Sequence, residues 1–109
     1  MQTYRLLSLT GGVLATGSLE EIGRALLGLD GAKWCATPAF DEWLDNIIPG
    51  QWWAGRRTGS RLTILDWLTV EAPDEATAEV LLAEAMTRRA LAAPLGRAWT
   101  GVWVEKIAD

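Results

Sequence analysis

The sequence predicts one α+β domain that spans residues 1–109. The length supports this, because a domain of 109 residues buries roughly 65% of the surface that its unfolded chain exposes. The composition supports it too, since 50% hydrophobic and 22% charged residues are typical of a folded domain. The third observation is that strand-like and helix-like segments alternate along the chain. We therefore expect an antiparallel or mixed sheet with helices packed on it.

The first predicted element is a β-hairpin over residues 3–16. Strand-forming residues occupy positions 4–9 and 13–16, on either side of a short turn. Gly11 and Gly12 lie in this turn, and glycine supplies the positive φ that a tight hairpin turn requires.

A helix is predicted to follow Ser18. Ser18 and Glu21 form a capping box, in which each side chain satisfies a backbone N–H group of the other residue. Leucine and isoleucine then recur at helical spacing, and Gly28 marks the end of the helix. Gly23 weakens such a helix by up to ~1 kcal/mol relative to alanine, unless it permits a close contact.

A second helix is predicted after a short strand at residues 33–36. Thr37 can cap this helix, and Pro38 suits its first position because the missing N–H group costs nothing there. Pro49 and Gly50 end the pattern. The apolar residues that repeat at helical spacing are Phe40, Trp43, Leu44, Ile47 and Ile48.

The second half of the chain is predicted to contain three strands and one long helix. We expect a short strand at residues 52–53, a turn at residues 58–59 and a central strand over residues 62–71. The long helix spans residues 74–92, and a last strand spans residues 99–107. This order favours a ferredoxin-like core with an added hairpin and helix, an analogy that carries no function with it.

The composition excludes several kinds of active site. The chain has no histidine, so it lacks a Ser-His-Asp triad, an imidazole base and a histidine metal ligand. Cys35 is the single cysteine, which rules out an intrachain disulfide and a cysteine-based zinc site. We expect a protein that is not an enzyme and has no catalytic residue, metal or cofactor. With no signal-peptide or membrane-span pattern, we also expect a cytoplasmic location and no membrane contact.

Acidic residues around the start of the long helix are the first candidate binding site. They are Glu71, Asp74, Glu75 and Glu79. The basic residues of the same helix, Arg88 and Arg89, lie roughly 14 Å beyond Glu79, which exceeds a physiological Debye length of about 8 Å. Such a surface would favour rapid docking on a basic, nucleic-acid-handling protein. The alternative is an ordinary solvated helix face.

These observations favour a non-enzymatic protein-binding module, either an inhibitor or an adaptor. Small acidic proteins without catalytic residues are encoded by phages and mobile elements, and anti-CRISPR proteins are one example of that class. This expectation rests on size, charge and the missing chemistry, because no sequence motif names a partner.

A cluster of tryptophan and arginine over residues 51–61 is the second candidate binding site. Trp52 or Trp53 could stack a base while Arg56 and Arg57 hold phosphates, which predicts a single-stranded nucleic-acid binder as the alternative function. The same residue types are common at protein interfaces. They are also compatible with two core tryptophans and two solvated arginines. The net charge of −4 argues against nucleic acid, whose binding usually requires a basic surface.

Two further features concern the predicted sheet. Trp99 and Trp103 are four residues apart on the last strand, so they should share a face, with Trp67 across from them. We expect helices to cover this face and the protein to be a monomer or a weak homodimer. Asp66 falls on the apolar face of the strand over residues 62–71, which calls for a bulge, an edge position or an arginine partner.

Overall fold

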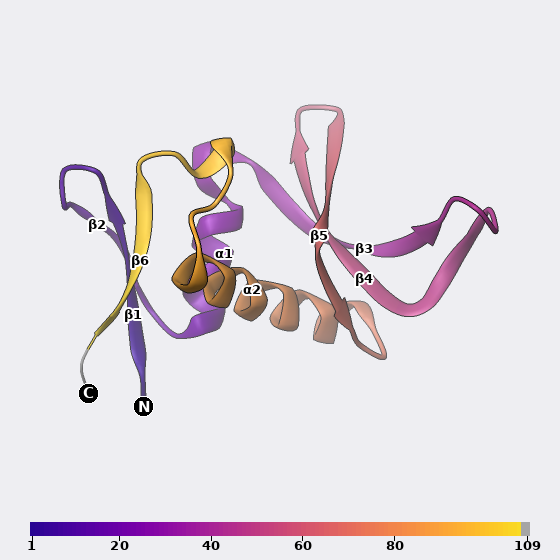
Figure 1. Ribbon diagram of the computed structural model, residues 1–109, viewed down its shortest axis with the longest axis horizontal. Coiled ribbons are helices and arrows are strands. Elements are labelled where there is room, and N and C mark those ends of the chain that lie inside the picture. Colours follow the sequence, from indigo (N-terminus) through magenta and orange to yellow (C-terminus); the bar gives the residue numbers. More distant parts are fainter. Residues whose placement is uncertain (108–109) are drawn as a thin grey trace.

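The computed structural model describes residues 1–107, without the side chain of Arg97. In this part of the chain, two helices lie between two three-stranded sheets (Figure 1). The helices are α1 (Leu19–Leu27) and α2 (Glu75–Ala92), and single turns of 3-10 helix form η1 (Leu29–Gly31) and η2 (Arg97–Trp99). The strands are β1 (Thr3–Ser8), β2 (Val13–Gly17), β3 (Lys33–Asp41), β4 (Asn46–Thr58), β5 (Arg61–Glu71) and β6 (Val102–Ile107).

Both sheets are antiparallel, and the predicted α+β class is confirmed. The first sheet has the order β2-β1-β6 and joins the two ends of the chain, since Thr3 pairs with Ile107. The second sheet has the order β3-β4-β5, three strands that follow one another in sequence. The strand over residues 62–71, predicted to be central, is therefore an edge strand, and β4 is the central one. The strands are thus divided between two sheets, whereas a ferredoxin-like core would join them in one.

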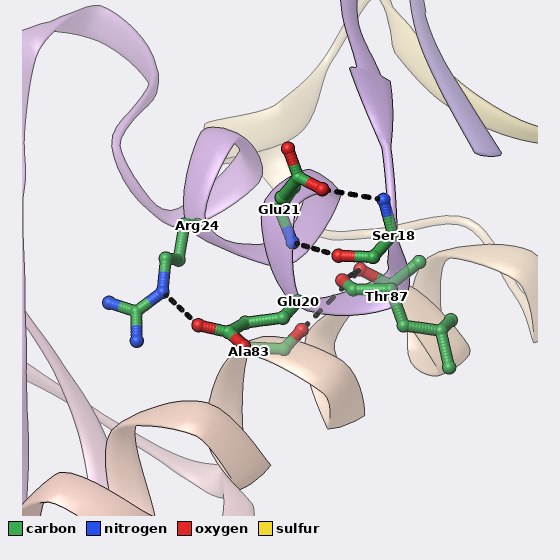
Figure 2. Close-up of polar contacts among 7 residues, drawn as sticks. Ser18, Glu20, Glu21, Arg24, Ala83 and Thr87 are labelled. Carbon is green, nitrogen blue, oxygen red and sulfur yellow. Dashed lines mark hydrogen bonds and ion pairs between the residues drawn. The ribbon is translucent and has the colours of Figure 1, made fainter. Parts of the chain in front are cut away.

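Helices α1 and α2 pack closely on each other between the two sheets. Gly23 is buried, and a Cβ atom added to it would lie 1.7 Å from the carbonyl oxygen of Ala83. The hydroxyl of Thr87 donates to the carbonyl oxygen of Leu19 at 2.6 Å and also contacts that of Ala83 at 3.4 Å (Figure 2). The paired helices form one layer, and each side of that layer receives a sheet: α1 packs on β1 and β2, while α2 packs on the second sheet and on β6.

The N-terminal predictions and the long helix are confirmed. The predicted hairpin forms as β1 and β2, and Gly11 in its turn has a φ of +84°. Ser18 and Glu21 make both hydrogen bonds of the capping box, each at 3.2 Å (Figure 2). The glycine at position 23 does permit a close contact between helices. Asp74 caps α2, which ends at the predicted residue.

The predicted helix over residues 38–48 is wrong. Strand β3 continues to Asp41 and β4 begins at Asn46, so the two strands form a long hairpin in place of a short strand and a helix. An amphipathic helix needs a surface that covers its apolar stripe. Four of the five side chains in this stripe are exposed, while residues 33–38 pair in register with residues 52–57 and extend the ladder. The predicted strand at residues 52–53 is accordingly one part of a longer strand.

The core lies between the helix layer and the two sheets. It forms one cluster of buried side chains drawn from both helices, both sheets and η2. Its largest fully buried side chains are Leu6, Ile22, Leu26, Leu27, Leu82, Met86 and Thr87. The β3–β4 hairpin extends beyond this core and away from the helices, at one end of the longest axis of the molecule (Figure 1).

Candidate functional site

The end of the β3–β4 hairpin exposes large apolar side chains. We call residues 40–47 the hairpin tip. Trp43 is 97% exposed and Leu44 is 74% exposed. Phe40 and Ile47 pair across the two strands just below them and are 40% and 53% exposed. Folded proteins seldom leave a group of large apolar side chains in water unless it serves an interaction.

The turn within the hairpin tip holds Trp43 and Leu44 in a defined position. The Asp41 carboxylate accepts hydrogen bonds from the backbone N–H groups of Trp43 at 2.9 Å and Leu44 at 3.3 Å. Asp45 has a φ of +49°, the left-handed conformation that reverses the chain at little cost for an aspartate. A turn that is already ordered loses less conformational entropy when a partner covers it.

Carboxylates surround the apolar side chains of the hairpin tip. Asp41, Glu42 and Asp45 lie within six residues of Phe40, and the sequence has no basic residue between Lys33 and Arg56. The hairpin tip therefore combines an apolar centre with negative charge. The sequence pattern assigns the apolar side chains of the tip to a helix stripe, because their exposure depends on a hairpin that the pattern does not predict.

The base of the hairpin is fixed to the loop before α2. Gly50, with a φ of +78°, bends β4, and its carbonyl oxygen accepts a hydrogen bond of 2.9 Å from the N–H group of Ala72. The indole N–H of Trp52 donates to the carbonyl oxygen of Ala72 at 3.1 Å. These bonds tie the hairpin to the segment that carries the predicted acidic cluster.

The acidic cluster lies around the N-terminal end of α2, as its sequence positions imply. Glu71, Asp74 and Glu75 are exposed, and Glu79 is half-buried. Among the described residues, no lysine or arginine lies within ion-pair distance of these four carboxylates. Asp74 has a structural role as well: its carboxylate accepts a hydrogen bond of 2.8 Å from the N–H group of Thr77, which lowers the pKa of Asp74. The acidic cluster continues the negative charge of the hairpin towards its base.

The tryptophans and arginines of β4 do not gather on one face. Trp52 packs against the core, and Arg56 lies over Trp99 on the same side of the sheet, with its Cζ atom 5.0 Å from the ring centroid. Side chains alternate along a strand, so Trp53 and Arg57 point to the opposite side. On the face away from the core, the nucleic-acid interpretation thus retains one tryptophan, Trp53, and one arginine, Arg57.

Four side chains from four elements stack in a row that the sequence pattern did not reveal. The rings of Trp67 on β5 and Trp99 on η2 meet edge to face, with centroids 5.9 Å apart. Arg56 covers Trp99, and Arg89 of α2 lies over Trp67 with its Cζ atom 5.7 Å from the centroid. These four residues form what we call the Arg–Trp row. No sequence signal predicts it, because the row depends on how β4, β5, α2 and η2 meet.

The prediction that Trp99 and Trp103 share a strand face is wrong. Trp99 belongs to η2, is only 5% exposed and donates its indole N–H to the carbonyl oxygen of Leu26 at 2.8 Å. Gly101 has a φ of +85° and reverses the chain before β6 begins, so Trp103 lies on a separate element and is 42% exposed.

Asp66 lies in a bulge of β5, one of the situations expected for it. Ala54 pairs with Leu65 and Trp53 with Thr69, so the register shifts by several residues on β5 between these pairs. Asp66 is therefore exposed although residues of the apolar face flank it in sequence. The same bulge carries Trp67 into the Arg–Trp row.

Within residues 1–107, no three histidine, cysteine, aspartate or glutamate side chains come together in a way that could hold a metal ion. Neither of the helices described there has the length and apolar character needed to cross a membrane.

Comparisons with protein-family models, with curated proteins and with solved structures find no match for this chain.

Proposed function

We propose that this protein is a non-enzymatic binding module that docks through its hairpin tip on a protein with a basic surface. The observation that supports this most directly is the exposure of Trp43, at 97%, together with Leu44 at the end of an ordered hairpin. The partner surface would offer an apolar pocket for these two side chains and basic groups around it.

Burial of Trp43 and Leu44 against a partner would contribute favourable free energy of binding. Burial of a large apolar side chain contributes about 1.5–3 kcal/mol, and tryptophan is among the residues that most often dominate interface energies. Because the Asp41 hydrogen bonds already order the turn, more of this energy remains available for binding. Trp43 and Leu44 are thus suited to be the main contacts, with Phe40 and Ile47 beside them.

Charge supports a basic partner. The carboxylates of the hairpin tip and the acidic cluster near the base of the hairpin have the same sign, and the chain carries a net charge of −4. A surface of this kind attracts a basic protein over about one Debye length, roughly 8 Å in physiological salt, and speeds association. A nucleic-acid-handling protein is a partner class with such a basic surface.

The proposal includes the biological roles expected from the sequence. A projecting hairpin on a small acidic body suits an inhibitor or an adaptor, of which the anti-CRISPR proteins of phages are one example, in a cytoplasmic setting. The alternative function, single-stranded nucleic-acid binding through residues 51–61, has less support, because Trp52 packs against the core and Arg56 lies over Trp99. Only Trp53 and Arg57 of the four residues then remain for a nucleic acid.

Site-specific photo-crosslinking in cells of the source organism tests this proposal. A photoreactive amino acid would replace Trp43 in one variant and Trp103, which is exposed on β6 in the other sheet, in a matched control. We expect position 43 to crosslink a basic protein and position 103 to give no such product. Equal labelling from both positions, or products from position 103 alone, would refute docking through the hairpin tip.

A further inference from the structure

Three members of the Arg–Trp row, Trp67, Arg89 and Trp99, line a cleft on the surface. The cleft has a volume of about 320 Å³ and is lined by Trp67, Arg89, Pro94, Leu95, Gly96 and Trp99. We call it the Arg–Trp cleft. Trp67 is 45% exposed at its opening. A cavity of about 150 Å³ is known to admit a benzene ring, so this cleft has room for an indole ring.

The arginines of the row have no acidic partner. Among the described residues, no carboxylate lies within 4.0 Å of the guanidinium nitrogens of Arg56 or Arg89. Both are held by indole rings instead, and the buried Nε atom of Arg56 has no hydrogen-bond partner. The Arg–Trp cleft therefore presents apolar walls and at least one accessible cation, Arg89, which is exposed.

The hairpin tip has the complementary chemistry. It offers an exposed indole and an exposed leucine, accompanied by three carboxylates, where the cleft offers apolar walls and the guanidinium group of Arg89. Its own cleft is out of reach: the tip extends from the end of the molecule beyond the start of α2, while Arg89 lies near the other end of that helix (Figure 1). Contact between the two surfaces must join separate molecules.

We propose that the hairpin tip of one copy docks in the Arg–Trp cleft of a second copy. Trp43 would pack against Trp67 and Leu95, and the carboxylates of the hairpin tip would pair with Arg89. The inference rests on the proposed function, because it uses the same binding surface and names one partner for it. Self-docking would compete with any other protein for the hairpin tip.

This contact is head-to-tail, which determines how the protein assembles. Each molecule has one tip and one cleft on different parts of its surface, so a docked pair retains a free tip and a free cleft. Assembly then grows with concentration into short chains unless the geometry closes a ring. Because the contact includes ion pairs, it weakens as salt is added.

Sedimentation of the purified full-length protein tests the proposal. We expect the average mass to rise with protein concentration and to fall when salt is added. Trp43→Ala, which alters the tip, and Arg89→Glu, which alters the cleft, should each remain monomeric at concentrations where the wild type associates. Arg57→Glu is the matched control, since it makes the same charge change on an exposed residue outside the cleft and should associate as the wild type does.

A mixture of the two inactive variants provides the decisive measurement. Arg89→Glu keeps an intact tip, and Trp43→Ala keeps an intact cleft, so together they should form a complex of one chain of each and nothing larger. Circular dichroism and thermal melts check that both variants are folded. If Arg89→Glu is not folded, Arg89→Gln serves as the cleft variant in its place.

The possible results separate this proposal from the proposed function. A wild type that stays monomeric at every concentration, association that survives either variant, or a mixture that forms no complex would overturn self-docking. If self-docking is overturned in this way, crosslinking from position 43 to a different protein would still support the proposed function. Self-association that passes the mixing test, with no other crosslinked protein, would support the inference and identify a second copy as the partner of the hairpin tip.

Discussion

Gly23 on α1 lies against Ala83 on α2 so closely that a Cβ atom at position 23 would stand 1.7 Å from the carbonyl oxygen of Ala83. Two backbones are thus in direct contact at the centre of the molecule. No side-chain rotation relieves such a clash, because the nearest atoms belong to the main chain of the second helix.

Gly23→Ala should therefore destabilise the protein severely. Alanine gains up to ~1 kcal/mol of helix propensity, but forced separation of the helices should cost about 3 kcal/mol or more. Urea unfolding followed by circular dichroism measures the net loss. Gly96→Ala is the control, since a Cβ atom there meets open space. A variant at position 23 that is as stable as the wild type would contradict the packing of the two helices.

The hydrogen bond between Asp74 and Thr77 should make the stability of the fold depend on pH in the acidic range. The N–H group of Thr77 lowers the pKa of the Asp74 carboxyl below its ordinary value of 3.8. A lowered pKa stabilises the fold fully above the ordinary value, and this contribution is lost as pH falls through the folded-state value. Asp74→Asn keeps a capping side chain that does not titrate.

Wild type and Asp74→Asn should differ in how their melting temperatures fall with pH. We expect the stability of the wild type relative to the variant to decrease below about pH 4, in the range where Asp74 gains its proton. Thermal melts at a series of pH values measure this difference. Parallel melting curves across that range would show that the cap contributes no pH dependence.

Trp99→Phe tests the buried indole hydrogen bond. Phenylalanine preserves most of the apolar volume but removes the indole N–H group that donates to the carbonyl oxygen of Leu26, which should cost about 1–3 kcal/mol. Trp103→Phe, at a position 42% exposed, should change stability by less than about 0.5 kcal/mol. Similar unfolding free energies for the two variants would argue against the placement of Trp99 in η2.

Trp43→Ala should leave the free energy of unfolding within about 0.5 kcal/mol of the wild type, because a side chain that is 97% exposed loses almost no contacts. Fluorescence quenching by a neutral quencher such as acrylamide checks the same point: the accessible fraction of the emission should drop when Trp43 is removed. A large loss of stability would mean that the hairpin tip packs on the body of the protein.

The caps and turns that depend on residues close together in sequence could be predicted from the sequence alone. The capping box at Ser18, the hairpin turn at Gly11 and the cap at Asp74 each depend on residues a few positions apart, and each forms as expected. The long helix and the α+β class follow from periodicity in the same way. For these elements, no knowledge of the tertiary structure was needed.

The β3–β4 hairpin and the Arg–Trp row were not predictable in this way. The spacing of Phe40, Trp43 and Ile47 fits a helix, but the choice between helix and strand was decided by pairing with β4 and by the absence of a surface to cover the stripe. The acidic residues were identified from their positions, whereas their relation to the hairpin depends on the contact between Gly50 and Ala72.

The hairpin tip contributes nothing to the buried core, whose members lie outside residues 40–47. Substitutions in these residues can therefore alter recognition while the fold stays unchanged, so selection can act on binding and on stability separately. The same independence makes the tip a place where other short sequences could be grafted: the strands below would display them at a fixed distance from the core. A scaffold of this kind can acquire a new partner by changing one turn.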